Sequence, residues 1–445
     1  MKTGAYRWAW LALPLVVLGL VPGWFGGDEV QLVEAGRQAA VPTPHYGAQA
    51  LFYRPLAWHA LALQLSWLGS WPRLVHSLDV LHHLLNAQLL ARLLGRTCPQ
   101  LRRGPVFLAF AVSPLALGAA GWSAAAVDRF ALTGMLAAAS CVLAAAGGPP
   151  AARVLGAGLL TAVALMCKET AVVLPAQLAV IWWWRPSAVD RRAWAMVAAI
   201  VALYLAWRWF GYFAHVAPSA ASPAYAMSLA PARLASNAAI YAAAPFPPWI
   251  ANIELLRRQP EQHLWAIGFG AGLHGLLVWM LARATTNRLA LAYVAAYTVA
   301  VAPMLPLAKV ELHYTYVAAL PFAVVVARLW DSHLTRTRRT LLVLTLASVW
   351  ARGVGISLKL WRHGTVEAVA RAALAQHPPP AAGTTVVVAG EPGAPLSVLD
   401  RAFAGVPTVE GWRVVVMPDA TPRPMAEWCL RLATDGAVTL LPPAR

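Results

Sequence analysis

A set of polar residues on one predicted helix provides the first candidates for chemistry. In the run from Leu74 to Leu90, LVHSLDVLHHLLNAQLL, these residues are spaced three, four and three apart, and they are His76, Asp79, His83 and Asn86. At about 100° per residue they share one helix face. Such a face could form a hydrogen-bonded seam between helices, face a substrate, or bind a metal through two histidines and one aspartate. Nothing else in the sequence indicates a metal, so the seam is favoured.

Two adjacent carboxylates, Asp28 and Glu29, directly follow the first long hydrophobic run. The local pattern GDEVQ fits a helix that begins with Asp28 as N-cap and has Gln31 three positions later, a variant of the capping box. Glu29 and Glu34 would then stabilise the start of that helix through its dipole. From spacing alone, a capping role is the favoured interpretation.

Two further groups of charged and polar residues interrupt apolar sequence. Lys168 and Glu169 divide a nearly continuous apolar stretch. They could form a solvated turn with a weak local ion pair, or they could be a functional pair, and the two interpretations are weighted equally. The stretch AKVELHYTYVAALP is either a snorkelling interfacial cluster or part of a site. Its polar members are Lys309, Glu311, His313, Tyr314 and Tyr316. Because a charge inside a membrane costs about 2.5 to 3.5 kcal/mol on insertion scales, such positions are the best guide to a site.

These residues must be positioned by membrane-spanning helices. Of the 445 residues, 60% are hydrophobic and only 12% are charged, whereas a soluble domain has roughly 25% charged residues. With about 20 apolar residues per crossing, the sequence predicts an all-α polytopic membrane protein with about 11 transmembrane helices. The predicted spans are 6–25, 74–94, 104–122, 128–147, 151–167, 170–185, 193–213, 264–283, 288–306, 313–330 and 340–357.

The basic residues predict the orientation of these spans. The net charge is +17, and arginines concentrate in short loops between hydrophobic runs, near residues 92–103, 185–192 and 336–339. By the positive-inside rule these loops are cytoplasmic, which places the N-terminus inside and the C-terminus outside. Long outer loops then comprise residues 25–73 and 214–263. Since topology accounts for much of the positive charge, it is no evidence for a nucleic-acid partner.

The sequence predicts a transmembrane domain over residues 1–358 and a small extramembrane α/β domain over residues 359–445. In the second domain TTVVVA, RVVVMP and AVTLL are predicted strands, and Pro424 to Thr434 is a predicted helix. In the outer loops, Pro55 to Leu68 is too short to span and is predicted to be an interfacial helix. A second loop helix is predicted from Leu234 to Ala244, before APFPPW.

Several short motifs occur in a characteristic order. They are GDE after the first span, YRPL (53–56), HLLNAQLLARLL (83–94), WSAAAVDRF (122–130), CKETAVVLP (167–175) and ELHYTYVAALP (311–321). Together they resemble the bacterial relatives of the protein O-mannosyltransferases and of the tetratricopeptide-repeat transmembrane mannosyltransferases, within the GT-C superfamily. The resemblance covers roughly residues 1–330, and it is carried by the ordered recurrence of the motifs.

The resemblance implies a GT-C-like glycosyltransferase of the bacterial inner membrane. Such an enzyme takes a sugar from a polyprenyl-phosphate carrier within the lipid and passes it to a glycan, lipid or protein acceptor on the outer side. It maps the catalytic acidic pair to Asp28 and Glu29, with Asp28 taking the proton from an acceptor hydroxyl. Direct displacement would invert the anomeric centre. No cofactor is certain, and a divalent metal between donor phosphate and carboxylate is left open.

The leaving polyprenyl phosphate accumulates negative charge, which nearby cations would stabilise. Candidates for these cations are Arg54, Lys168 and His313. The full set of candidate donor- or substrate-binding residues is Tyr53, Arg54, His76, Asp79, His83, Lys168, Glu169, Glu311, His313 and Tyr314.

Departures from the family pattern keep other functions open. Ser113 and Gly118 stand where relatives often carry an HP pair and a glutamate, and there is no tetratricopeptide tail. The alternatives are a transporter or flippase of lipid-linked saccharides, whose polar second span lines a pathway, and a catalytically silent membrane partner with the same fold. Transporters tend to show two corresponding halves with interrupted helices, and the sequence shows no such symmetry.

Overall fold

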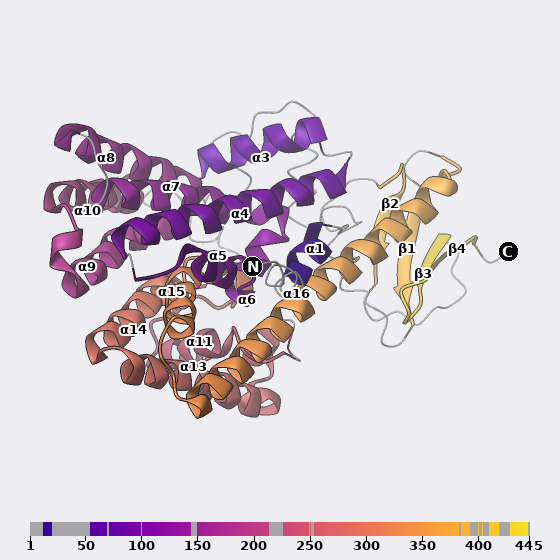
Figure 1. Ribbon diagram of the computed structural model, residues 1–445. Coiled ribbons are helices and arrows are strands. Elements are labelled where there is room, and N and C mark those ends of the chain that lie inside the picture. Colours follow the sequence, from indigo (N-terminus) through magenta and orange to yellow (C-terminus); the bar gives the residue numbers. More distant parts are fainter. Residues whose placement is uncertain are drawn as a thin grey trace, which may run out of the picture. The chain divides into compact units, whose positions relative to one another are not determined.

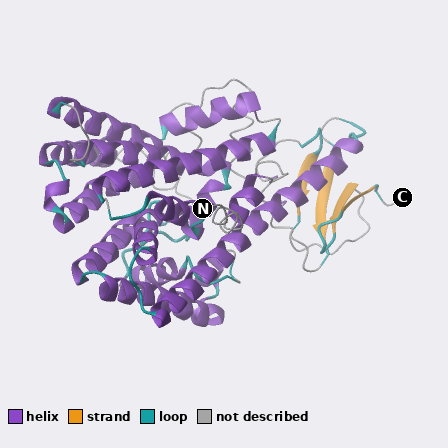
Figure 2. Cartoon of the chain, viewed as in Figure 1, coloured by secondary structure: helices purple, strands orange, loops and turns teal. Residues whose placement is uncertain are grey.

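The computed structural model describes residues 12–19, 54–68, 71–98, 100–143, 149–212, 226–248, 250, 253–381, 384–391, 399, 403, 409–417 and 428–443. These residues form two compact units. The described residues of the helical unit lie within 12–15, 54–60 and 79–357, and those of the sheet unit lie within 16–19, 61–78 and 358–443. Figure 2 shows that the described chain is mostly helical with one small sheet, as the sequence predicts.

The described helices overlap the predicted spans and loop helices, although the predicted span 104–122 is divided between two helices and much of the span 6–25 lies outside the described residues (Figure 1). In chain order they are α1 (Leu13–Gly19), α3 (Pro55–Leu68), α4 (Pro72–Thr97), α5 (Arg103–Ala111), α6 (Pro114–Ala120), α7 (Ala126–Val142), α8 (Pro150–Cys167), α9 (Leu174–Trp184), α10 (Arg191–Ala206), α11 (Pro231–Ala243), α12 (Glu254–Arg258), α13 (Pro260–Ala284), α14 (Asn287–Val301), α15 (Ala319–Trp330) and α16 (Arg336–Gln376). The predicted interfacial helix is α3, with the predicted ends, and the second predicted loop helix is α11.

Among the described residues, five helical segments are long and apolar enough to cross a membrane. They are Ser123–Val142, Pro150–Cys167, Arg191–Phe210, Pro260–Ala284 and Arg336–Gln376. The pair α5 and α6 is a sixth candidate, bent by 62°. The bend follows from Pro114 at the first position of α6, because a proline disfavours helical backbone at the residue before it, here Ser113. The chain is therefore a multi-pass membrane protein, and the count of eleven crossings stays a prediction.

Small residues allow neighbouring helices of the helical unit to approach closely. A Cβ atom built at Gly134 on α7 would lie 2.9 Å from the Cβ of Ala164 on α8. A Cβ atom at Gly158 on α8 would lie 2.9 Å from Cγ of Met196 on α10. Contacts of this kind between small residues are typical of helices that associate within lipid, and α7, α8 and α10 lie side by side (Figure 1).

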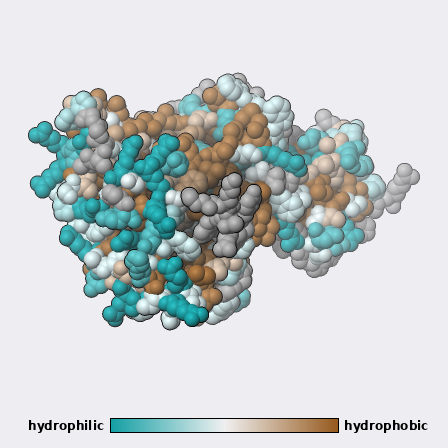
Figure 3. All heavy atoms as spheres, viewed as in Figure 1, coloured by the Kyte–Doolittle hydropathy of each residue, from teal (hydrophilic) through white to brown (hydrophobic). Residues whose placement is uncertain are grey.

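The arginine-rich loops meet at one end of the helical unit. Arg185, after α9, donates a 2.8 Å hydrogen bond to the carbonyl oxygen of Thr97 at the end of α4. Arg102, before α5, pairs with Asp331, which follows α15. Figure 3 shows hydrophilic residues gathered around the ends of α8, α9 and α10. This shared position agrees with loops that lie on a single side of the membrane.

The sheet unit contains a four-stranded sheet in the order β2-β1-β3-β4. Its strands are β1 (Thr385–Gly390), β2 (Arg413–Val416), β3 (Trp428–Leu432) and β4 (Val438–Leu441). Strand β1 pairs in parallel with β2 and β3, and β3 pairs antiparallel with β4. The C-terminal part of α16 packs on this sheet, and the contacting residues include Val366, Ala370, Leu374, Val386 and Val388.

One local prediction in this region is wrong, and one helix continues beyond its predicted span. Within the predicted helix Pro424 to Thr434, residues Trp428–Leu432 form β3, because Leu430 lies between Val388 of β1 and Leu440 of β4. The last span was predicted to end at residue 357, but α16 continues to Gln376. It continues because its C-terminal part has an apolar stripe at every fourth residue that the sheet covers.

Candidate functional site

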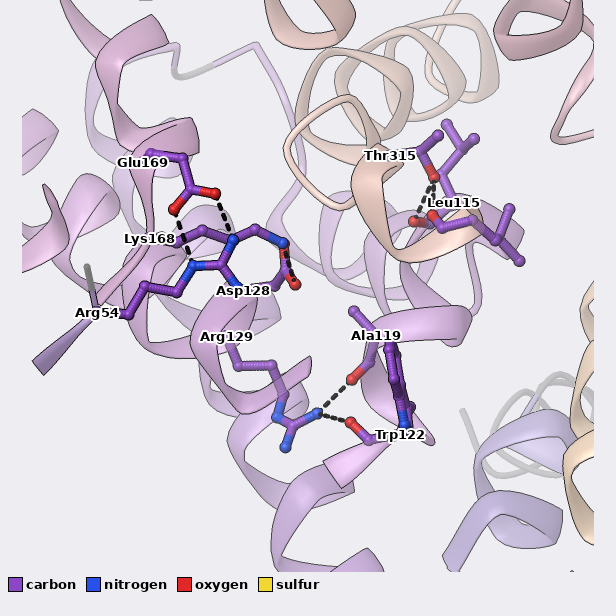
Figure 4. Close-up of polar contacts among 10 residues, drawn as sticks. Arg54, Leu115, Ala119, Trp122, Asp128, Arg129, Lys168, Glu169 and Thr315 are labelled. Atoms are coloured by element: carbon purple, nitrogen blue, oxygen red, sulfur yellow. Dashed lines mark hydrogen bonds and ion pairs between the residues drawn. The ribbon is translucent and has the colours of Figure 1, made fainter. Parts of the chain in front are cut away.

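Residues that are distant in sequence form one buried charged cluster, consisting of Arg54, Asp128, Lys168 and Glu169 (Figure 4). Lys168 Nζ lies 2.6 Å from both carboxylate oxygens of Asp128. Arg54 donates two hydrogen bonds to the carboxylate of Glu169, one from Nε to Oε2 at 2.8 Å and one from Nη2 to Oε1. The side chains of Lys168 and Asp128 are only 2% and 4% exposed. The cluster therefore consists of one fully buried ion pair and one partly buried pair, in which the side chains of Arg54 and Glu169 are 11% and 29% exposed.

Local backbone geometry explains why the adjacent residues Lys168 and Glu169 take different partners. Helix α8 ends at Cys167, and Lys168 is extended, with φ −159° and ψ 139°. A 3-10 helix, η3 (Glu169–Val173), begins immediately afterwards. Asp128 lies in the first turn of α7, where the helix dipole favours a carboxylate.

This geometry overturns the interpretation of Lys168 and Glu169 as a solvated turn with its own ion pair. Each residue instead bonds to a different segment. Burial acts to raise the pKa of Glu169, but the charge and hydrogen bonds of Arg54 and the charge of Lys168 lower that pKa to about 2. Burial lowers the pKa of Lys168, against the opposing attraction of Asp128.

The polar face of α4 contributes a second ion pair, between Asp79 and Arg129 of α7. Both side chains are buried, at 2% and 0% exposure. Arg129 also donates to the carbonyl oxygens of Ala119 and Trp122, the latter at 3.0 Å (Figure 4). The guanidinium thereby ties α4 and α7 to the end of α6.

His83 and Asn86 extend this network to the segment before α15. His83 Nδ1 lies 3.0 Å from the hydroxyl of Tyr316, and its Nε2 lies 3.0 Å from the carbonyl oxygen of Ala111. Asn86 donates to the carbonyl oxygen of Arg129 at 3.0 Å. This face of α4 is therefore a hydrogen-bonded seam between helices, which was the favoured interpretation.

The described residues do not support a metal on α4. His76 is also buried, at 4% exposure, but Asp79 and His83 already bind protein groups. Within the described ranges, no three or more His, Cys, Asp or Glu residues are grouped so that they could hold a metal ion.

The motif around His313 lies beside the charged cluster. Lys168 Nζ is 5.4 Å from the centre of the Tyr314 ring, and the His313 ring packs edge-on against Trp122 at 4.7 Å. His313 and Tyr314 belong to a short 3-10 helix, η10 (Leu312–Thr315). Glu311 is instead paired with Lys309 at 2.8 Å, with both side chains partly exposed.

Buried polar residues that the sequence reasoning missed hold this motif in place. Asn237 of α11 donates to the carbonyl oxygens of Leu305 and Leu307, at 2.8 and 3.0 Å. Glu254 accepts a 3.0 Å hydrogen bond from the backbone N–H of Val310. Both side chains come from the predicted outer loop, where polar residues are ordinary, so no local pattern indicated that they are buried.

Other missed residues did carry a signal. Asp128 and Arg129 are adjacent charges at the start of a predicted span, and Arg352 is a charge inside the last one. Arg352 is 1% exposed, and its Nε lies 3.3 Å from the carbonyl oxygen of Ala244. Its Nη1 and Nη2 meet no hydrogen-bond acceptor among the described residues. Because a guanidinium stays charged when buried, this position suits an anion.

The remaining predicted residues are only partly placed. Asp28, Glu29 and Tyr53 lie outside the described residues. Ser113 directly precedes α6 at the bend. A Cβ atom at Gly118 would lie 3.2 Å from the Leu312 side chain, so any side chain at this position would require the Leu312 side chain to shift.

Comparison with solved structures finds that the chain is similar to the crystal structure of ArnT from Cupriavidus metallidurans bound to undecaprenyl phosphate. The two chains are 16% identical, with a TM-score of 0.47, and the match covers 94% of this chain and 87% of that one. No family model matches the chain, and no curated protein matches it.

Proposed function

We propose that the protein is a GT-C glycosyltransferase of the bacterial inner membrane, which transfers a sugar from a polyprenyl-phosphate donor to a cell-envelope acceptor on the outer face. The convergence of the motifs is the observation that carries this proposal. Arg54, Asp128, Lys168 and Tyr314 come from four motifs whose order suggested the family, and these residues meet at one buried cluster. Motifs that served only helix packing would not need to bring together so many charges.

The cluster offers cations to a leaving phosphate. Arg54 and Lys168 are held in fixed positions by Glu169 and Asp128. Cations that are fixed before the reaction stabilise charge that develops in the transition state, without reorganisation.

Asp28 is the proposed base, with Glu29 supporting it. Asp28 takes the proton of the acceptor hydroxyl as that oxygen attacks the anomeric carbon. The bond from this carbon to the phosphate oxygen breaks, and polyprenyl phosphate departs with the electron pair. Displacement from the opposite face inverts the anomeric centre. The proposal assigns no residue to a metal.

The structure of the α4 face favours an enzyme over a transporter. In a transporter this face would line a pathway, whereas Asp79, His83 and Asn86 are engaged by α7 and by the segment before α15. A flippase would have to break these buried contacts in every cycle.

Sugar release from defined donors tests the proposal. Purified protein in proteoliposomes is supplied with a panel of radiolabelled polyprenyl-phosphate sugars and an envelope extract. We expect the label to leave the carrier, either as glycosylated acceptor or as free sugar from hydrolysis. Movement of intact donor between leaflets without cleavage would favour the flippase, and neither cleavage nor movement would favour the silent partner.

A further inference from the structure

An apolar cavity of about 160 Å³ lies between the helices α4, α7, α9, α14 and α15. Each of these helices contributes a hydrophobic or aromatic side chain to the wall, among them Leu90, Met135, Leu178, Tyr293 and Val324. Apolar cavities of this size exclude water and bind apolar ligands. In a protein surrounded by lipid, the apolar ligand that is available is the hydrocarbon chain of a lipid.

A second cavity of about 420 Å³ adjoins the first and has a more polar lining. The two share wall residues, including Cys98, Trp184 and Arg185. The second cavity also reaches Arg328 and Thr286, so it lies at the end of the helical unit where the arginine-rich loops meet. Together the two cavities form an apolar chamber with a polar mouth.

The mouth is positively charged. Arg185 is held by hydrogen bonds from Nη1 to the carbonyl oxygen of Thr97 at 2.8 Å and to Cys98 Sγ at 3.3 Å. The guanidinium of Arg328 makes no hydrogen bond or ion pair with another residue in the described ranges. Thr286 is the N-cap of α14, so the positive end of that helix dipole adds to the same field.

The chamber is separate from the charged cluster. Helix α7 carries Asp128 in its first turn, whereas the α7 residues in the wall of the chamber run from Met135, about 10 Å further along the helix, to Ala139. A ligand in the chamber therefore does not occupy the proposed reaction site.

We propose that this chamber binds an anionic glycerophospholipid, such as phosphatidylglycerol, from the leaflet at the arginine-rich end. One acyl chain fills the apolar chamber, and the phosphate lies between Arg185 and Arg328. The net negative charge is the basis of selection, because two guanidinium groups and a helix N-terminus favour an anion over a zwitterion. This site does not depend on the proposed glycosyltransferase activity.

Native mass spectrometry of the full-length protein in detergent tests this site. The protein is titrated with phosphatidylglycerol or phosphatidylcholine that carries the same acyl chains. We expect a first lipid to bind tightly as phosphatidylglycerol, and we expect the double variant Arg185→Gln, Arg328→Gln to weaken this step by about 10- to 100-fold. The matched control, Arg192→Gln with Arg336→Gln, removes two exposed arginines outside both cavities and should bind like the wild type.

A second variant tests the chamber itself. Ala296→Phe fills the space beside α14 and should abolish the tight step without changing the charge. The proposal is overturned if both lipids bind equally to the wild type, or if the control pair weakens binding as much as the mouth pair. It is also overturned if polyprenyl phosphate, added as a competitor, displaces phosphatidylglycerol at equimolar concentration. If Ala296→Phe does not fold, the comparison of lipids on the wild type and the arginine variants decides.

Discussion

At the scale of single residues, the pair of Lys168 and Asp128 shows what a buried charge requires. Each charge is almost fully withdrawn from water and is compensated by the other at 2.6 Å. Such a pair adds little net stability compared with a matched apolar pair, but removal of one partner leaves an uncompensated charge. The same interaction would keep a cation in place for the donor phosphate.

The variant Lys168→Met should therefore lose about 3 to 5 kcal/mol of unfolding free energy, because Asp128 is left without its partner. The double variant Lys168→Met, Asp128→Leu should recover most of that loss. Chemical unfolding in detergent, followed by intrinsic fluorescence, measures both. If Lys168 also serves the reaction, sugar transfer should remain lost in the stable double variant. A double variant as unstable as the single one would contradict this account.

Glu169 provides a prediction about pH. Its pKa is lowered from 4.5 to about 2 in the folded protein. A lowered carboxyl pKa contributes stability that is fully present above the unfolded pKa and is lost as pH falls through the folded pKa. The difference in Tm between wild type and Glu169→Gln should therefore stay constant from pH 8 to about 5 and shrink between about pH 4.5 and 2. A difference that already shrinks near pH 6 would show that Arg54 does not hold this carboxylate.

The sequence could identify many of these residues but not their partners. Lys168, Asp79 and His83 stand out because polar groups are costly in apolar segments. The same rule applies to Asp128, which was quoted only as part of the motif WSAAAVDRF and was not singled out as a site residue. Which cation meets which carboxylate depends on helix packing, and no local pattern encodes that.

At the scale of elements, close helix contacts position the cluster. Asp128 begins α7 and Lys168 follows α8, so their pairing depends on how near these helices lie. Gly134 makes this approach possible, because a Cβ there would be 2.9 Å from Ala164 Cβ and 3.2 Å from its backbone nitrogen. The backbone of Ala164 cannot move out of the way of an added Cβ as the end of a flexible side chain could.

The variant Gly134→Ala should destabilise the protein by about 1 to 3 kcal/mol through overpacking. Gly275→Ala is the matched control, because a Cβ at Gly275 on α13 meets no heavy atom within 4 Å. Unfolding in detergent compares the two. Equal stability of the variants would mean that α7 and α8 are not in close contact.

Elements were predictable where the local pattern decides the structure. The first and last residues of α3 follow from Pro55 at its start and a break after Leu68, and β1, β2 and β4 follow from runs of Val and Leu. Strand β3 was mistaken for a helix because the extended conformation of WCLRL depends on its pairing with β1 and β4. The length of α16 was missed because its C-terminal stripe is apolar only toward the sheet.

At the scale of the whole molecule, the arginine-rich loops predict orientation. Their common position at one end of the helical unit fits a cytoplasmic location by the positive-inside rule. Alkaline phosphatase fused after Arg445 should be active in a bacterial host, because the predicted C-terminus is periplasmic, and a green fluorescent protein fused there should stay dark. Bright fluorescence with an inactive phosphatase would reverse the predicted orientation.

Transfer of sugar by Asp28→Asn is the most direct test of the central claim that the protein is a glycosyltransferase with its base on the first outer loop. The measurement is a single-turnover assay with a radiolabelled polyprenyl-phosphate sugar that the wild type accepts. We predict a rate lowered by about 10²- to 10⁴-fold, as expected for a lost general base, with donor binding retained. Glu34→Gln, the same charge change six residues later, should keep its rate. Equal rates for wild type and Asp28→Asn would contradict the account and leave Asp28 as a helix cap.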